Sequence, residues 1–176
     1  MILSDSELVE MLREPRTRRE GFAVLVKQYS EKLYWKVRRI VLSHEDANDV
    51  LQNVFIKVWN NLQNFQGKSS LSTWLYRIAI NESLDFLRKQ KLADKVSADE
   101  DVSVASRLMS DEYFDGDEVQ ARLQEAVARL PEVQRTVFNL KYFEEMKYSE
   151  ISQILNTSEG ALKASYHLAV KKITEY

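Results

Sequence analysis

A stripe of polar residues near the C-terminus shows what chemistry this sequence can support. In the segment SEGALKASYHLAVKKI, one face of a helix would carry Glu159, Lys163, His167 and Lys171, which recur at every fourth position. Lysines on such a face suit contacts to phosphate oxygens, and the small side chain of Ala164 permits close approach to a thymine methyl group. The stripe therefore predicts a DNA-facing helix of modest charge, although an ordinary solvated helix face has a similar composition.

Two short helices must hold this stripe in place. Apolar residues at helical spacing predict two inner faces, one with Ile151, Ile154 and Leu155 and the other with Leu162, Tyr166, Ala169 and Ile173. Between them, Asn156 suits the left-handed conformation that ends a helix, and Ser158 suits the N-cap of the next helix. This order is typical of a helix-turn-helix, while a hairpin that only packs two apolar faces together is the alternative.

The sequence does not indicate a catalytic or metal-binding site. It has no cysteine, and its two histidines, His44 and His167, lie in different predicted domains, so neither a metal-ligand set nor a catalytic triad is indicated. It also has no glycine-rich phosphate loop. We therefore expect a protein that is not an enzyme and that needs no metal, no cofactor and no small-molecule substrate.

Charge is distributed unevenly along the 176 residues, although the net charge is only −2. Residues 21–91 hold 11 Lys/Arg and 6 Asp/Glu, residues 92–120 hold 2 and 9, and residues 121–176 hold 8 and 7. Four glycines and two prolines are too few for many short strands and favour long helices. We expect an all-α protein with a domain over 1–91, a flexible acidic linker over 92–117 and a second domain over 118–176.

Helical periodicity predicts where the individual elements begin. A short helix is expected near Asp5 to Leu12, a long one over 21–41, and further helices after Ser43, after the serines at 69–70, near Val119 and at Pro131. The helix after Ser43 is expected to bury Phe55 and Trp59, and Val119 and Val133 are assigned to buried faces. Pro131 suits the first helical position. The absence of a basic leader and of a run of about 18 apolar residues predicts a cytoplasmic protein.

Three motifs in one order resemble a bacterial RNA polymerase sigma factor of the extracytoplasmic-function type, the minimal branch of the sigma-70 family. The segment DANDVLQNVFIKVW is similar to region 2.2 of that family, FQGKSSLSTWLYRIAINESLDFLRK to regions 2.3 and 2.4, and the chain from Leu130 to Ile173 to region 4. The resemblance implies a promoter-specificity subunit that binds core polymerase through its β′ coiled coil and its β subunit. In region 2.2 the family docks on that coiled coil with a polar stripe, which here is Asp49, Gln52 and Asn53, with Asn53 standing where the family usually has Glu.

The same resemblance implies that the first domain melts and holds the minus 10 promoter element. Unstacked bases need aromatic rings and polar groups that read their exposed edges. The residues expected to contact this DNA are Lys57, Phe65, Lys68, Ser69, Tyr76, Arg77, Asn81 and Arg88. Asn81 interrupts an apolar run and can pair with a base edge, or alternatively cap a neighbouring helix from a partly buried position. Tyr76 is preferred over Trp74 as a base contact, because Trp74 fits the core.

The second domain is implied to read the minus 35 element, with contacts from Ser158, Glu159, Lys163, Ala164, His167 and Lys171. Family members commonly carry Arg at the positions of Ser165, Leu168 and Val170, so this helix is poorer in charge. When two DNA-binding domains are held on one polymerase, binding of one places the other at a high effective concentration near the DNA. Each domain can therefore bind DNA weakly by itself.

Further partners follow from the resemblance. An anti-sigma protein is expected to bind the chain, and the acidic linker, which includes Asp99, Glu100, Asp101, Asp111 and Glu112, is expected to mimic nucleic acid in the polymerase. Two rivals belong to other classes of protein. One is a helix-turn-helix regulator that binds duplex DNA without polymerase, and the other is an adaptor that binds only protein.

Overall fold

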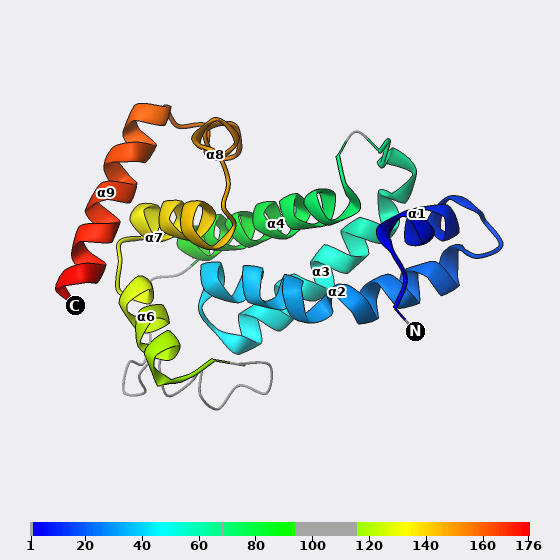
Figure 1. Ribbon diagram of the computed structural model, residues 1–176, viewed down its shortest axis with the longest axis horizontal. Helices are drawn as coiled ribbons and strands as arrows, with labels where there is room; N and C mark the ends of the chain where they lie inside the picture. The colour runs from blue at the N-terminus through cyan, green and yellow to red at the C-terminus, as the bar shows by residue number, and fades with distance from the viewer. Residues whose placement is uncertain (1, 68, 94–115) are drawn as a thin grey trace. The chain divides into compact units, whose positions relative to one another are not determined.

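The chain folds into two compact units, Met1–Asp94 and Lys95–Tyr176, and every regular element in the part that the structure describes is helical (Figure 1). This computed structural model describes residues 2–67, 69–93 and 116–176. The expected all-α class is therefore confirmed. Lys68 and the five linker carboxylates named above lie outside the described residues.

In its described residues, the first unit is a bundle of four helices. These are α1 (Asp5–Arg13), α2 (Arg18–Val41), α3 (His44–Asn60) and α4 (Leu71–Ala93), with a single 3-10 turn, η1 (Leu62–Asn64), between the last two. Helix α3 begins where expected, because the Ser43 hydroxyl accepts the Asp46 N–H at 3.2 Å. The Ser70 hydroxyl accepts the Thr73 N–H in the same way at the start of α4. These caps confirm the predicted helix starts.

Aliphatic side chains from α2, α3 and α4 fill the core of this unit. Leu25, Leu33, Val54 and Leu75 are all fully buried. Tyr34 is fully buried as well, and its hydroxyl group lies 2.7 Å from Nδ1 of His44, so that α2 is linked to the first turn of α3. Helix α1 crosses the start of α2 so closely that a Cβ on Gly21 would lie 2.8 Å from Cβ of Met11. Glycine is required there because the two backbones nearly touch.

The second unit has α6 (Glu118–Ala128), α7 (Glu132–Phe138), α8 (Tyr148–Leu155) and α9 (Glu159–Glu175). Its core holds Val127, Leu130, Phe138 and Ala169. Two expectations for this unit are wrong. Val119 and Val133 are exposed rather than buried. Pro131 is the extended N-cap residue of α7, one position before the helix, because its ψ angle of 148° cannot belong to a helical turn.

A π-helix, η2 (Asn139–Phe143), continues α7 and was not predicted. The Glu144 N–H donates to the Asn139 carbonyl five residues earlier, at 3.1 Å. Asn139 and Leu140 in this turn are both buried. The wider turn thus contributes two residues to the buried interior of the second unit.

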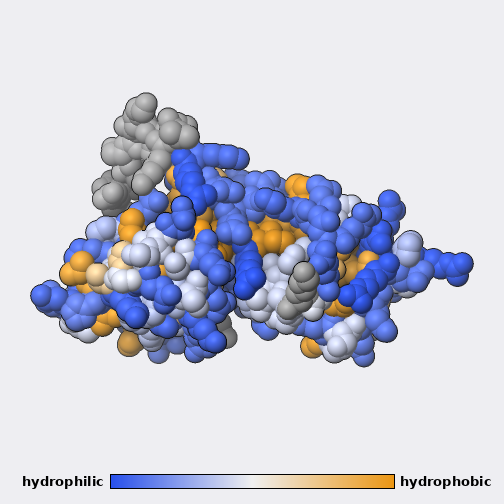
Figure 2. All heavy atoms as spheres, turned by 90° about the horizontal axis from the view of Figure 1, so that it is seen from above, coloured by the Kyte–Doolittle hydropathy of each residue, from blue (hydrophilic) through white to orange (hydrophobic). Residues whose placement is uncertain are grey.

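The surface is mostly hydrophilic, with hydrophobic residues visible in small areas between polar ones (Figure 2). Among the residues that the structure describes, no helix combines the length and the apolar character that crossing a membrane requires.

Candidate nucleic-acid and protein interfaces

The turn between α8 and α9 has the geometry that its residues predict. Asn156 adopts the left-handed conformation, with φ 53° and ψ 47°, and ends α8. The Ser158 hydroxyl accepts the Ala161 N–H at 3.2 Å and caps α9. Both local predictions are confirmed, so the chain forms a helix-turn-helix with a well-defined entry into its second helix.

Helix α9 presents the predicted polar stripe to solvent. All six residues assigned to minus 35 DNA are exposed: Ser158, Glu159, Lys163, Ala164, His167 and Lys171. On the opposite side of the helix, Leu162 and Ala169 are buried. The structure therefore brings the six residues together on one accessible side of α9.

Tyr148, at the start of α8, is a neighbour of this stripe that the sequence alone did not indicate. Nζ of Lys163 lies 5.7 Å from the centroid of its ring, and Nζ of Lys141 lies 4.4 Å from the same centroid. An aromatic ring attracts ammonium groups through its electron-rich faces. Tyr148 thus attracts the ammonium groups of Lys141 and Lys163 to its ring beside α9.

Helix α4 presents the predicted minus 10 residues along one exposed side. Arg77, Asn81 and Arg88 are all exposed, which does not fit the alternative of a partly buried Asn81 that caps another helix. Ser69 is half-buried just before the N-cap residue, Ser70. Arg88 pairs with Asp85 at 2.6 Å.

Lys57 of α3 lies beside α4 but already has an anionic partner. Its Nζ is 2.7 Å from Oε1 of Glu82, and the hydrogen bond and charge of Glu82 raise the pKa of Lys57. Lys57 is thus held at the edge of α4, with part of its charge offset by Glu82.

Aromatic rings lie near this side of α4 in two separate contacts. Phe65 and Trp74 are both half-buried, with centroids 5.0 Å apart, so Trp74 is less buried than its assignment to the core implied. Tyr76 is also half-buried. Its ring centroid lies 6.5 Å from that of Tyr29 in an edge-to-face contact, and Nζ of Lys36 lies over the Tyr76 ring, 4.1 Å from its centroid. Tyr76 is therefore packed against α2, a relation that the spacing along α4 did not show.

The predicted polymerase-binding residues lie together on α3. Asp49, Gln52 and Asn53 are exposed, while Val50 and Val54 on the other side of the helix are buried. Their spacing of three and four residues places them on one face. The structure thus offers a continuous polar stripe to a partner.

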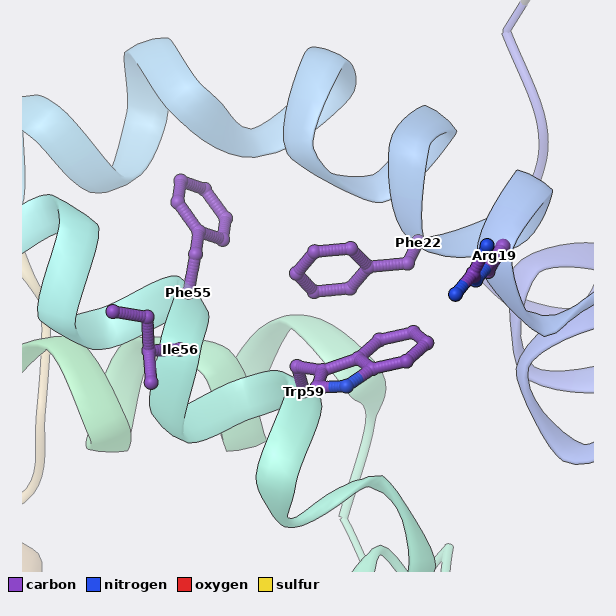
Figure 3. Close-up of a pocket in the computed structure, with 5 residues that line it drawn as sticks. All are labelled: Arg19, Phe22, Phe55, Ile56 and Trp59. Atoms are coloured by element: carbon purple, nitrogen blue, oxygen red, sulfur yellow. The ribbon is translucent and has the colours of Figure 1, made fainter.

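An apolar groove lies beside α3 one to two helical turns beyond this stripe, and Figure 3 shows the side chains that line it. It has a volume of about 390 Å³ and is lined by Arg19, Phe22, Phe55, Ile56 and Trp59. The side chain of Ile56 is 58% exposed and that of Trp59 is 38% exposed, so the prediction that Trp59 is buried is wrong.

Ring contacts explain why the groove stays open. Trp59 packs edge to face on Phe22 at 5.1 Å, and Phe55 meets Phe22 at 6.4 Å, so all three rings line a shared wall rather than fill the bundle. The sequence carried one signal for this groove. Ile56 follows Phe55 directly, so the apolar face of α3 is wider here than a buried face requires. Exposed apolar area of this kind marks contact with a partner.

Comparisons with known proteins agree on the kind of protein to which these surfaces belong. Residues 25–93 match the family model for Sigma-70 region 2, and residues 120–173 match that for Sigma-70 region 4. The chain therefore belongs to the sigma-70 family of RNA polymerase sigma factors.

The curated relatives narrow the family to one branch. The chain is 33% identical to the ECF RNA polymerase sigma factor SigW of Bacillus subtilis, over 84% of each protein. It is 31% identical to the RNA polymerase sigma-H factor of Pseudomonas aeruginosa, over 91% of this chain and 86% of that protein. Within the sigma-70 family it is an extracytoplasmic-function sigma factor, which directs promoter-specific transcription.

Solved structures show the same fold. One is a structure of CnrH in complex with the cytosolic domain of CnrY. The match covers 97% of this chain and 92% of the chain in that structure, with a TM-score of 0.60 and 20% sequence identity. Another is a structure of the sigma factor RpoE in complex with the anti-sigma factor NepR from Bartonella quintana. That match covers 89% of this chain and 96% of the chain in that structure, with a TM-score of 0.60 and 19% sequence identity.

Proposed function

We propose that this sigma factor uses three separate surfaces, one for core polymerase and two for promoter DNA. The observation that supports this most directly is that each of the three helices exposes a group of the predicted residues: Asp49, Gln52 and Asn53 on α3, Arg77, Asn81 and Arg88 on α4, and Lys163, His167 and Lys171 on α9. The reaction of RNA synthesis belongs to the polymerase, which these surfaces direct to a promoter in the cytoplasm.

Helix α3 binds the coiled coil of the polymerase β′ subunit. Asp49, Gln52 and Asn53 supply polar contacts to a partner helix, and the groove at Ile56 and Trp59 accepts an apolar side chain from it. Because Asn53 carries no charge, the apolar contact contributes more of the affinity than it would beside a carboxylate.

Helix α4 holds the opened minus 10 element. Melting leaves unstacked bases, which an aromatic surface such as Phe65 on Trp74 stabilises by stacking. The amide of Asn81 both donates and accepts, so that it pairs with the edge of one exposed base. Arg77 and Arg88 contact the DNA backbone, as does Ser69 before the start of α4, and we propose the same for Lys68, which is outside the described residues.

Helix α9 enters the major groove of the minus 35 element. The free N–H groups at its N-terminus favour a phosphate near Ser158, and Lys163 and Lys171 add charge along the same side. Ala164 and His167 then approach the base edges, where a small side chain admits a thymine methyl group.

We also infer that an anti-sigma protein controls the chain, since the similar RpoE structure contains one. Such a protein would compete with core polymerase. In a binding assay, its addition should release this chain from the polymerase, and simultaneous binding of both would contradict this inference.

The decisive experiment combines purified cognate core polymerase, this chain and a library of genomic DNA fragments. Sequencing of the run-off transcripts should find start sites that require the chain and that share two upstream elements. Core polymerase without the chain is the control. Failure to form a holoenzyme, or a footprint on DNA that needs no polymerase, would favour the helix-turn-helix regulator.

A further inference from the structure

Three side chains form a stack where α2 crosses α4. Nζ of Lys36 lies 4.1 Å from the ring centroid of Tyr76, and the ring of Tyr29 meets that of Tyr76 at 6.5 Å and 66°. The hydroxyl group of Tyr29 donates to Oδ1 of Asp5 on α1 at 2.6 Å. The Tyr76 ring is thus fixed by contacts that originate on two other helices.

This arrangement restricts what Tyr76 can do for DNA. One face of its ring is covered by the Lys36 ammonium group, and the ring packs edge to face with that of Tyr29, so a base cannot stack on the covered face without displacing Lys36. The contact instead favours a limited set of positions for the Lys36 side chain, which would otherwise sample many rotamers. A pre-positioned cation binds an anion at a smaller entropic cost.

The position of Lys36 borders the proposed minus 10 surface. Arg77 follows Tyr76 directly, and Asn81 lies one helical turn beyond Arg77, with both side chains exposed. Lys36 is half-buried on α2, so its ammonium group adds positive charge along the flank of this surface. A strand bound along Arg77 and Asn81 would carry phosphates past that flank.

We propose that Lys36 binds a backbone phosphate of the promoter strand held on α4, and that Tyr76 is a positioning residue that holds the Lys36 ammonium group. The inference rests on the proposed function of α4 as the minus 10 surface. It assigns α2 a DNA contact and replaces the expected base contact of Tyr76 with an indirect role.

The test measures open-complex formation by the holoenzyme over a series of salt concentrations. Lys36→Gln should lower promoter affinity by roughly three- to tenfold near physiological salt and reduce the slope of log affinity against log salt by about 1. Lys36→Arg should retain most of the affinity. Lys27→Gln is the matched control, because Lys27 is exposed on the same helix nine residues earlier, on the opposite face, and should change neither quantity.

Substitutions of Tyr76 separate positioning from stacking. Tyr76→Phe keeps the ring face and should retain most of the promoter affinity, whereas Tyr76→Leu should lose about as much affinity as Lys36→Gln. In the double variant, Tyr76→Leu should add little to the loss from Lys36→Gln, because both changes remove the same contact.

Three results would overturn the inference. One is an unchanged salt slope for Lys36→Gln, and another is a full additional loss from Tyr76→Leu in the Lys36→Gln background. The third is a lower thermal midpoint and weaker core binding at an unchanged salt slope, which would reveal a purely structural contact. If the unmodified holoenzyme gives no promoter-specific transcripts, the proposed function itself fails, which is a separate outcome.

Discussion

At the scale of single residues, Asn81 offers the sharpest test of DNA reading by α4. Its amide is exposed on a helix whose stability does not depend on it, so Asn81→Ala should reduce promoter-dependent transcription by about tenfold, the loss expected for a good base contact. Core binding and thermal unfolding should stay unchanged. Gln90→Ala, an exposed polar change on the same helix, is the control, and equal activity of the two variants would remove Asn81 from the interface.

The ion pair between Lys57 and Glu82 leads to a prediction of stronger, rather than weaker, promoter binding. Removal of the carboxylate in Glu82→Gln frees the Lys57 ammonium group, so the affinity of the holoenzyme for promoter DNA should rise by about two- to threefold at low salt. The free energy of unfolding should change by about 1 kcal/mol or less, because water still reaches this partly exposed pair and screens it. Filter binding at two salt concentrations checks this, with Glu31→Gln on α2 as the control; a weaker affinity would mean that Glu82 itself supports the contact.

Residue roles that depend on neighbours from other helices could not be predicted from the sequence. The exposure of Asn81 follows from the pattern along α4, because helical spacing alone defines that side. The contact of Tyr76 with Lys36 and the exposure of Trp59 depend on how α2 packs on its neighbours, which spacing within a single helix does not describe.

At the scale of elements, the first turn of α3 carries a carboxylate whose ionised form is disfavoured. Burial raises the pKa of Asp46 above its ordinary value of 3.8, and the charges of Asp49 and Glu45 raise it further. The folded chain therefore binds more protons than the unfolded chain between the two pKa values, so this group adds stability as the pH falls through that interval.

The variant Asp46→Asn tests this pH dependence. It should be more stable than the unmodified chain at about pH 7, and the difference should shrink as the pH falls through the raised pKa of Asp46, where the carboxyl group becomes protonated. Denaturant unfolding at several pH values measures it. A difference that is constant with pH would contradict the proposed cause.

The turn between α8 and α9 depends on one backbone conformation. Asn156→Ala should destabilise the second unit by about 1 kcal/mol, because a Cβ without a local hydrogen-bonding group is unfavourable at φ 53°. Asn156→Gly is the matched variant and should cost much less. Hydrogen exchange of α8 and α9 amides distinguishes the two, and equal protection in both variants would show that the conformation is not the cause.

Elements were predicted best where a short local signal decides them. Caps such as Ser43 and Ser158 and the left-handed Asn156 act within a few residues, so their sequence signals are sufficient. The π-helix lacks such a signal, because it depends on how Asn139 and Leu140 fit a core formed by distant residues. Pro131 was misplaced by one position for a related reason, since an N-cap and a first helical residue differ only in ψ.

At the scale of the whole molecule, the two DNA surfaces belong to separate units and should contribute independently. In the double variant Asn81→Ala with Lys163→Ala, the fold losses in transcription should multiply, because free energies of distant sites add. Promoter-dependent transcript yield measures this, with each single variant as the reference. If the double variant gives the same transcript yield as the less active single variant, the two contacts are not made on one promoter at the same time.

The π-helix after α7 has a consequence for how this chain tolerates changes in length. A π turn contains one residue more than the α turn that it replaces, so η2 can be viewed as an insertion that a helix absorbed without an added loop. Loss of one residue from this turn would convert it to regular α-helix and rotate all that follows by about 100°. Relatives that lack the residue must therefore compensate in the short connection to α8, and that is where insertions and deletions in this part of the family should be concentrated.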